Sequence, residues 1–556
     1  MKKKINFFIF YLIIFFSFNL IANEVPQYIQ PEPSSKKSND RKFLTTRDFI
    51  VVTANDYATT IGFKVLKDGG NAVDSAIAIQ ILLGLVEPQS SGLGGGLFIT
   101  YYDAKKKKTY SYEGREISPK KIQEDVFLDE SGKPKKFFNA AIGGLSVGVP
   151  GTLKTLKLFH NDFGHMEWEK IINYAIEFSK KGFIPSPRLI NALKKEKYLF
   201  RLNPNSIYKK IINNPKKKFF NEEYTNTLKT ISKNSSDFYN GKIAKSIIKT
   251  VIEAKNPGLV SYSDFKSYKS KKQRAFCHKL DNNYTLCGPN LPSSGTICVA
   301  QALMIYESIL KNLKSMNLNK ILSILDFVYF LRSKTLADPD FEKIDYESLL
   351  DKKKLFENFK NFKKKDLKVK TSNINELINS TSHFSVIDSF GNVVSATSSI
   401  ESSFGSRLFT NGFFLNNQLT DFSFKNKDEN NKPIKNRPGG GKRPLSSMSP
   451  IIVLDKNDKP LLTIGSPGGK AIISYVFRVL IDVLYKDLEI YKSVQSPNFI
   501  KINGKIYLED KSLEKKVSND KSVIRNLTSG LAVIKKTKNG FIGVADYRRD
   551  GSVRGQ

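Results

Sequence analysis

The side chains best suited to chemistry are densest in the last third of this chain, between positions 381 and 469. Hydroxyls, amides and glycines recur there in four short segments: Thr381-Ser382-His383, Asn416 to Phe422, Lys442 to Pro450 and Gly465 to Gly469. Taken singly, each segment also fits a strand start, a loop, a turn or a glycine bend. A reaction in this region must use hydroxyls, backbone amides and a few charges.

Other kinds of site find little support. The four histidines, His160, His165, His278 and His383, lack the spacing to cysteines or carboxylates that a zinc site needs, so we expect no metal. No phosphate-binding loop and no Gly-x-Ser-x-Gly elbow occurs. The glycines at 92–96 fail as a dinucleotide loop because Leu97 stands where the third glycine belongs. The sequence does not exclude a Ser–His–Asp triad that uses His383.

A predicted hairpin positions the first of these segments. The stretches 384–388 and 393–397 have the composition of short strands around a turn at 389–391. A three-residue loop pairs residue 388 with 392, and the same register carries Thr381 opposite Ser399. Two hydroxyl residues therefore face each other across the hairpin.

The other elements are predicted more coarsely. Apolar positions from Ala72 to Leu85, after a polar start, predict a buried helix that ends at Glu87-Pro88. The glycine-rich turn that follows indicates a close backbone approach between this helix and a strand at 97–102. Residues 150–350 are mostly helical in pattern, and the Lys-rich stretch 350–378 is predicted to be an exposed linker.

Composition excludes several classes of protein. The chain has 556 residues, of which 40% are apolar and 12% aromatic, too many for a disordered polymer. The length alone suggests several domains. The net charge of +36 invites a nucleic-acid partner, but the lysines form scattered clusters without a zinc-finger or RNA-binding motif. We therefore expect a solvated basic surface and no nucleic acid, with attraction to an anionic membrane or cell wall as the lesser alternative.

The N-terminus has the pattern of an export signal. Three lysines precede an apolar run from Ile5 to Ile21, and Ala22 suits cleavage. The predicted division is a signal peptide at 1–22 followed by a mobile leader at 24–45, and an uncleaved anchor is the rival. Export permits disulfides, and Cys277 and Cys287 flank a turn-like sequence that could pair them. Cys298 is expected to be a buried thiol.

From about residue 47 onward the chain resembles the gamma-glutamyltranspeptidase family. The resemblance rests on the four segments above and on six motifs that precede them in the chain. All of these motifs occur in the same order as in the family. The six are Gly-Gly-Asn-Ala-Val-Asp at 69–74, Glu87-Pro88, Gly114-Arg115-Glu116, Ser146 to Gly151, Pro292 to Gly295 and Ala337 to Phe341.

The resemblance implies an α+β fold of the N-terminal nucleophile hydrolase type, an αββα sandwich that becomes two chains after self-cleavage. The cut would fall between Ser380 and Thr381, giving a large subunit (23–380, with an exposed tail at 350–380) and a small subunit (381–556). Thr381 would be the nucleophile, and its α-amine, with a pKa near 8, would be the base. Ser399 would support the nucleophile, and the amides of Gly468 and Gly469 would form the oxyanion hole.

The same resemblance implies a γ-glutamyl amide, such as glutathione, as substrate. Arg115, Ser446 and Ser447 would bind the α-carboxylate, while Gln418 and Asp421 would bind the α-ammonium. The acyl group would pass to water or to an amino acid or dipeptide, and no cofactor is implied. An exported enzyme of this kind would be periplasmic or secreted.

Two departures from the family pattern bear on the substrate. Glu401 stands where the family commonly has asparagine, so a second carboxylate could strengthen ammonium binding or repel the α-carboxylate. The stretch 425–443 contains no aromatic residue and looks shorter than the tyrosine-bearing lid of other members, which favours hydrolysis over transfer. The alternatives are an acylase of the same fold for glutaryl-type amides, and an inactive exported basic binding protein.

Overall fold

The computed structural model describes residues 42–313, 316–363, 380–517 and 522–556. The signal-peptide prediction and most of the predicted leader and tail lie outside these ranges. Within them, no helix combines the length and apolar composition needed to cross a membrane.

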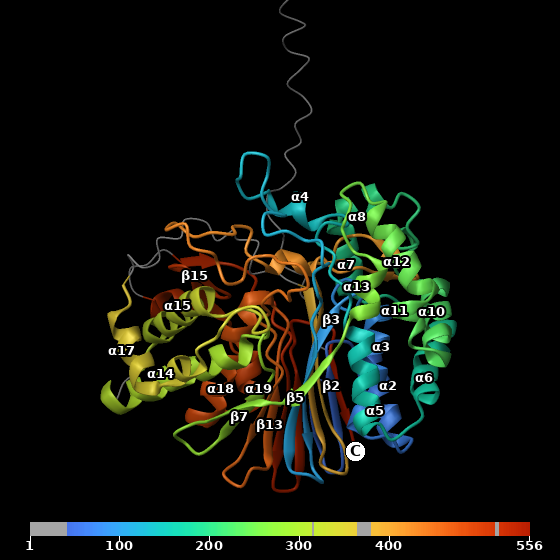
Figure 1. Cartoon of the computed structure of the whole chain (residues 1–556). Helices are drawn as coiled ribbons and strands as arrows, with labels where there is room; N and C mark the ends of the chain where they lie inside the picture. The colour runs from blue at the N-terminus through green and yellow to red at the C-terminus, as the bar shows by residue number, and fades with distance from the viewer. Residues whose placement is uncertain (1–41, 314–315, 364–379, 518–521) are drawn as a thin grey trace, which may run out of the picture.

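Two seven-stranded antiparallel sheets stand face to face at the centre of the molecule (Figure 1). The first sheet has the order β19 (Ser552–Gly555), β2 (Ile50–Thr53), β8 (Ser380–Ile387), β9 (Val393–Glu401), β3 (Gly96–Asp103), β4 (Lys108–Gly114) and β5 (Lys271–Arg274). The second has the order β1 (Phe43–Thr46), β18 (Gly540–Ala545), β17 (Ala532–Thr537), β13 (Pro460–Ile464), β12 (Ile451–Leu454), β7 (Thr285–Gly288) and β6 (Phe276–Lys279).

One layer of helices covers the first sheet. Figure 1 shows it on the right. Its members are α2 (Asp56–Lys67), α3 (Ala72–Val86), α5 (Thr152–Phe163), α6 (Trp168–Lys181), α7 (Pro187–Lys195), α8 (Lys197–Leu202), α9 (Lys209–Asn213), α10 (Glu222–Lys233), α11 (Asp237–Asn240), α12 (Lys242–Ile252) and α13 (Tyr262–Ser267). The short α4 (Phe137–Ala141) lies above the sheets in the same view.

A second layer of helices covers the other sheet. It contains α14 (Gly295–Leu313), α15 (Leu318–Thr335), α16 (Tyr346–Leu350), α17 (Lys352–Asn361), α18 (Ile472–Tyr485) and α19 (Ile490–Gln495). Smaller pieces complete the described chain: β10 (Phe409–Thr410), β11 (Phe413–Phe414), β14 (Phe499–Ile502), β15 (Lys505–Leu508), β16 (Ser522–Ile524) and the 3₁₀ turns η3 (Gln418–Asp421), η4 (Gly469–Ala471) and η5 (Lys511–Lys516).

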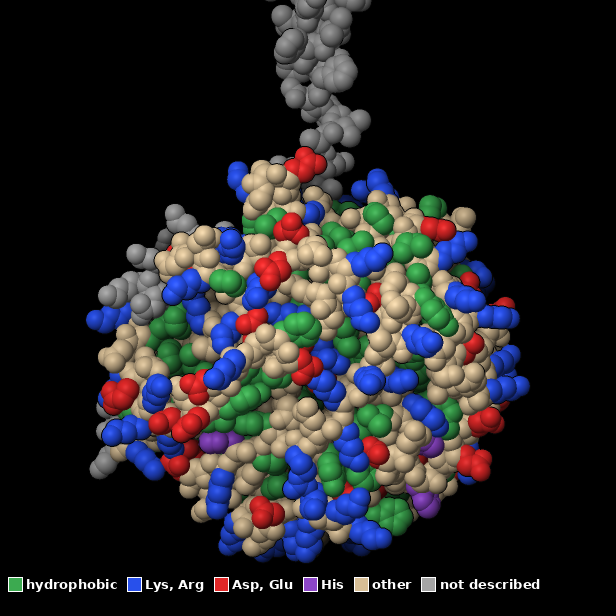
Figure 2. Space-filling model, in the orientation of Figure 1, with side chains coloured by type: hydrophobic (Ala, Val, Ile, Leu, Met, Phe, Trp, Pro, Cys, Tyr) green, Lys and Arg blue, Asp and Glu red, His purple; other side chains and the backbone are tan. Residues whose placement is uncertain are grey.

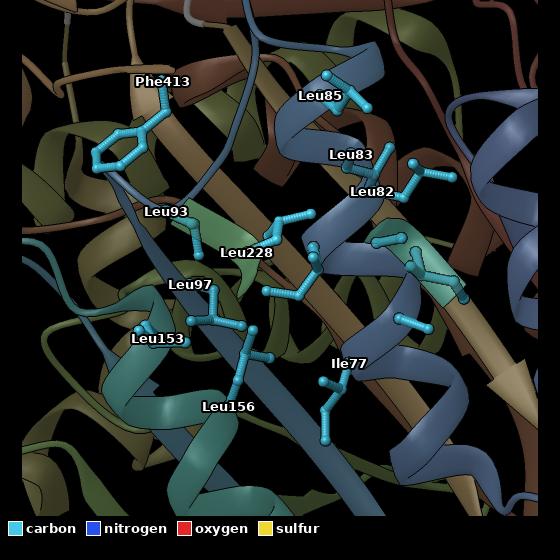
Figure 3. Close-up of a cluster of buried hydrophobic side chains, with 14 of the residues drawn as sticks. Ile77, Leu82, Leu83, Leu85, Leu93, Leu97, Leu153, Leu156, Leu228 and Phe413 are labelled. Carbon is cyan, nitrogen blue, oxygen red and sulfur yellow. The ribbon is translucent and has the colours of Figure 1, made fainter. Parts of the chain in front are cut away.

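The predicted buried helix is α3, and it forms the centre of the larger apolar core. All of its residues are buried, and Figure 3 shows side chains of α3, among them Ile77, in one apolar cluster with side chains of β3 and α5. Asn71 caps its first turn, with Asp74 bonding back to the cap, which is the capping box that stabilises such a start. A helix without a polar face must be enclosed on all sides, so α3 is a fixed support for the strands beside it.

Two expectations about exposed segments are wrong where the structure describes them. Residues 43–45 lie in β1, paired with β18, and the side chain of Lys42 is buried, so this end of the predicted leader is part of the fold. The predicted linker at 350–378 begins as helix α17, with Leu355 buried against the second core, because its apolar residues recur on one face between the lysines. Residues 364–379 lie outside the described part of the chain.

The basic excess lies on the surface. Figure 2 shows lysine and arginine side chains spread over the visible face, with acidic side chains among them. Cys277 and Cys287 pair across the β6–β7 hairpin with an S–S distance of 2.07 Å, and Cys298 is a buried free thiol, as expected.

Candidate active site

The hairpin of β8 and β9 carries the first group of candidate residues. Its register is the predicted one: Thr381 lies opposite Ser399, and Ile387 lies opposite Val393 next to the turn. The register shifts between Ser380 and Thr381, because Ser380 pairs with Glu401. Ile400 is therefore the extra residue of a β-bulge at the Ser380–Thr381 peptide bond, and bulges redirect the backbone at such places.

A chain of short contacts joins the two hydroxyls to this bond. The Oγ1 of Thr381 donates to the Oγ of Ser399 at 3.2 Å, and Ser399 Oγ donates to the carbonyl oxygen of Ser380 at 2.8 Å. The backbone N–H of Glu401 donates to Ser399 Oγ at 2.9 Å. The hydroxyl of Ser399 is thus held in one orientation, between the hydroxyl of Thr381 and the carbonyl that precedes it.

The charged candidates form a second group. Arg115 is buried, and its Nη2 lies 2.6 Å from Oδ2 of Asp421. Gln418 donates from Nε2 to the same oxygen at 2.7 Å. The 3₁₀ turn η3 carries both Gln418 and Asp421, and the end of β4 leads into Arg115, so elements far apart in sequence meet here. A cation and an anion side by side suit a zwitterionic ligand.

Glu401 connects the two groups. Its Oε2 accepts from Nδ2 of Asn417 at 2.6 Å and from the hydroxyl of Ser402. Burial, followed by the negative charge of Asp421, raises the pKa of Glu401 to about 8. Since most of its population is then protonated at neutral pH, the second carboxylate of the pocket is a neutral group there. Its backbone is in the left-handed region, with φ of 79°.

Ser446 and Ser447 follow a stretch of backbone that contacts Arg115. Arg115 donates from Nε to the carbonyl of Pro444 at 2.9 Å and from Nη2 to that of Leu445 at 3.2 Å. The hydroxyl oxygen of Ser446 accepts from the N–H of Met448 at 3.2 Å. The structure thus brings the segment of Ser446 and Ser447 to the arginine, while the hydroxyl of Ser446 is engaged in its own turn.

Gly468 and Gly469 lie between β13 and α18. Their φ angles are 133° and 55°, values that favour glycine. Across the described part of the chain, no hydrogen bond starts from the backbone N–H of either residue. Both amides are therefore available as donors to a ligand.

Sequence reasoning missed two residues of the site. Arg549 is buried and donates from Nη1 to the carbonyl of Thr381 at 3.3 Å, and Asn417 holds Glu401. The charged run 546–550, enclosed between two strands, was the available signal for Arg549. For Asn417, the only signal in the sequence was its place in the second segment, Asn416 to Phe422.

The triad that used His383 does not form. The ring nitrogens of His383 lie 2.8 Å from Oγ1 of Thr397 and 3.4 Å from Oγ of Ser385, so they face hydroxyls. Burial lowers the pKa of His383 to about 3, which keeps the ring neutral. Among the described residues, no three acidic, histidine or cysteine side chains are grouped to hold a metal ion.

Two antiparallel sheets enclosed by helix layers are the fold of an N-terminal nucleophile hydrolase. A cephalosporin acylase from Bacillus halodurans has the same fold, with a TM-score of 0.76 over 95% of this chain and 99% of that chain at 19% identity. A gamma-glutamyltranspeptidase from Pseudomonas nitroreducens, complexed with L-DON, matches with a TM-score of 0.51 and 28% identity over 56% of this chain and 92% of that chain.

The sequence comparisons identify the family. The gamma-glutamyltranspeptidase family model matches residues 58–556. The glutathione hydrolase proenzyme of Bacillus subtilis is 31% identical over 96% of both chains, and that of Escherichia coli is 32% identical over 81% of this chain and 80% of its own. The chain belongs to the gamma-glutamyltranspeptidase family.

Proposed function

We propose that this protein is a self-processing γ-glutamyl hydrolase and transferase with Thr381 as its nucleophile. The proposal rests above all on one observation: the hydroxyl of Ser399 bridges the hydroxyl of Thr381 and the carbonyl oxygen of Ser380. The nucleophile and the bond it would cut thus share one hydrogen-bonded partner.

Self-cleavage follows from this arrangement. The Oγ1 of Thr381 attacks the carbonyl carbon of Ser380, while the hydroxyl of Ser399 stabilises the negative charge that develops on the carbonyl oxygen. The peptide C–N bond breaks, and the proton of Oγ1 ends on the nitrogen, which becomes the amine of Thr381. Water then hydrolyses the ester and leaves a carboxyl group on Ser380 and a free hydroxyl on Thr381.

Turnover uses the new N-terminus. The α-amine of Thr381 removes the proton from its own Oγ1 and later protonates the leaving amine. The acyl group forms an ester on Oγ1, with its oxyanion bound by the amides of Gly468 and Gly469. Water, an amino acid or a dipeptide releases the group. The ion pair between Arg115 and Asp421 supports a γ-glutamyl group as the substrate. In the complex, Arg115 would bind the α-carboxylate of the substrate and Asp421 would bind its α-ammonium, in place of their contact with each other.

The alternative, a glutaryl-type acylase, differs in its substrate, because a glutaryl group lacks the α-ammonium of a γ-glutamyl group. The carboxylate of Asp421, which pairs with Arg115, disfavours an acyl group that cannot bind it. We expect γ-glutamyl anilide to be hydrolysed faster than glutaryl anilide at pH 7, and Glu401→Gln to keep this ranking. Faster hydrolysis of glutaryl anilide would favour the acylase.

A gel of purified protein tests the nucleophile. The wild-type chain should separate into two bands, and the N-terminal residue of the smaller band should be Thr381. Thr381→Ala should remain one band and lose activity, while Thr381→Ser should be cut and retain part of it. Cleavage of Thr381→Ala, or a different N-terminus, would contradict the proposal.

Export to the periplasm or medium, with removal of residues 1–22, is part of the proposal. The three lysines, the apolar run and Ala22 support it, as does a disulfide between Cys277 and Cys287, which persists in oxidising compartments. The processed enzyme would be a heterodimer of 23–380 and 381–556.

A further inference from the structure

A tongue of three residues, Gln89 to Ser91, lies along the bulge at the Ser380–Thr381 bond. The bulge frees the N–H of Ile400 from the strand ladder, and this group donates to the carbonyl of Ser90 at 3.2 Å. The N–H of Phe404 donates to the carbonyl of Gln89 at 3.1 Å. The tongue therefore supplies the backbone acceptors that the irregular strand needs.

Side chains of the same tongue contact both neighbours of Thr381. The hydroxyl of Ser380 donates to Oγ of Ser90 at 3.1 Å, on one side of the bond. On the other side, the hydroxyl of Ser91 donates to Oγ of Ser382 at 3.1 Å. The two residues that flank Thr381 are thus held by consecutive serines.

A buried ion pair fixes the orientation of Ser90. Its hydroxyl donates to Oε2 of Glu87 at 3.2 Å and accepts from Nη2 of Arg188 at 3.1 Å. Arg188 also pairs with Glu87, and both side chains are fully buried. With its proton directed to Glu87, Ser90 can only accept from Ser380. A buried network of this kind holds one geometry, because breaking it would leave charges unpaired.

We propose that Glu87, Arg188 and Ser90 form a processing clamp, a set of positioning residues that acts in self-cleavage and not in turnover. The clamp rests on the proposed self-cleavage at Thr381. It holds Ser380 so that its carbonyl stays against the hydroxyl of Ser399, in reach of Thr381. Once the bond is cut, Ser380 is a chain end that no longer belongs to β8. The clamp is then not needed for turnover.

The test compares cleavage with turnover in the full-length chain. Newly made protein is pulse-labelled in cell-free synthesis, and its conversion to two bands is followed on a gel. We expect Ser90→Ala and Ser380→Ala each to slow conversion about tenfold, equivalent to the loss of one hydrogen bond of about 1.4 kcal/mol. Because both remove the same contact, the double variant should be no slower than either single one.

Mature enzyme supplies the second measurement. After complete conversion, Ser90→Ala should have the kcat and KM of the wild type. Ser75→Ala is the matched control, since it removes another buried serine hydroxyl of the same segment, one that bonds the carbonyl of Gly62. It should be processed at the wild-type rate.

The outcomes separate the two proposals. Wild-type cleavage rates in Ser90→Ala and Ser380→Ala, multiplicative slowing in the double variant, or an equal loss of kcat in mature Ser90→Ala would each overturn the clamp alone. A wild-type chain that stays whole, or is cut at another bond, would overturn the proposed function and the clamp with it.

Discussion

Glu401 shows how burial can change the chemistry that a residue type suggests. From its residue type alone, Glu401 would add a negative charge to a pocket that already contains Asp421. In the folded chain its desolvation outweighs the hydrogen bonds from Ser402 and Asn417 that favour the charged form, so its pKa rises. A protonated carboxyl has one donor and one free acceptor, much like the asparagine that the family commonly has at this position.

The raised pKa predicts a pH-dependent cost to stability. The pKa of Glu401 is about 8 in the folded chain and close to 4.5, the ordinary value for a glutamate, when unfolded. The unfolded state therefore loses this proton first, and stability falls as pH rises from about 4.5 through 8. We expect the Tm of Glu401→Gln to exceed that of the wild type by about 2 °C more at pH 8 than at pH 5.

Calorimetry at both pH values checks this expectation. Glu429→Gln, at an exposed carboxylate of the aromatic-free stretch, is the control and should show no such trend. A wild type and a Glu401→Gln variant whose Tm values change in parallel would mean that Glu401 is ionised throughout this range.

Sequence reasoning at this scale succeeded where contacts follow from local geometry. The length of the turn at 389–391 sets the register of an antiparallel hairpin, so the pairing of Thr381 with Ser399 could be worked out from residue numbers. Arg549 and Arg188 approach the same hairpin from distant segments, and no periodicity links them to it. The state of Glu401 depends on burial, which residue types alone do not give.

At the scale of elements, helix α3 holds the β8–β9 hairpin at both ends. The residues that follow its C-terminus contact the open end of the hairpin through Ser90. At the closed end, Asp388 in the turn accepts from the N–H of Ala72, the first residue of α3, at 2.8 Å. The same side chain accepts from the N–H groups of Phe390 and Asn392 at 3.0 and 2.9 Å. One buried carboxylate thus closes the turn and caps the helix.

Asp388→Ala should destabilise the protein by about 2–3 kcal/mol, because a helix N-terminus and two turn amides lose a charged acceptor. The midpoint of urea unfolding measures the change. Asp48→Ala is the control, since Asp48 is exposed at the same end of the sheet, and it should have a midpoint close to that of the wild type. Equal midpoints for the two variants would show that the hairpin does not depend on this cap.

Elements with mixed composition were the hardest to predict. The four residues of β1, Phe-Leu-Thr-Thr, are too few to show alternation and belong to an edge strand. In α17, seven lysines and other polar residues hide an apolar stripe that only the second core explains. By contrast, α3 was predicted with nearly its observed ends, since a long apolar run with a polar cap has few alternatives.

On the scale of the whole molecule, the proposed cut divides one fold rather than two domains. Both sheets contain strands from before and after position 380, paired with one another: β2 pairs with β8 and β19, β3 pairs with β9, and β1 pairs with β18. Neither product has a complete sheet of its own. The two chains should therefore elute together on size exclusion after cleavage and separate only when the fold is lost.

Lys42 is a buried cross-link between these two products. Its Nζ donates to the carbonyl oxygens of Arg549 at 2.5 Å, Gly551 at 2.6 Å and Asp546 at 3.2 Å. Burial lowers the pKa of Lys42, while Asp546 and two further aspartates act against this shift. The loop it holds also carries the guanidinium that bonds the carbonyl of Thr381, so this contact joins assembly to the position of the nucleophile.

Lys42→Met keeps the length of the side chain but leaves three carbonyls without their donor. We expect the processed enzyme to lose about 2–4 kcal/mol of stability to urea and to show a lower kcat with little change in KM, since Thr381 is affected more than the pocket around Arg115. Lys105→Met, at an exposed turn, should match the wild type in both measurements. If Lys42→Met unfolds at the wild-type urea concentration, the ammonium contributes nothing to holding the two chains together, and the strand pairings alone do so.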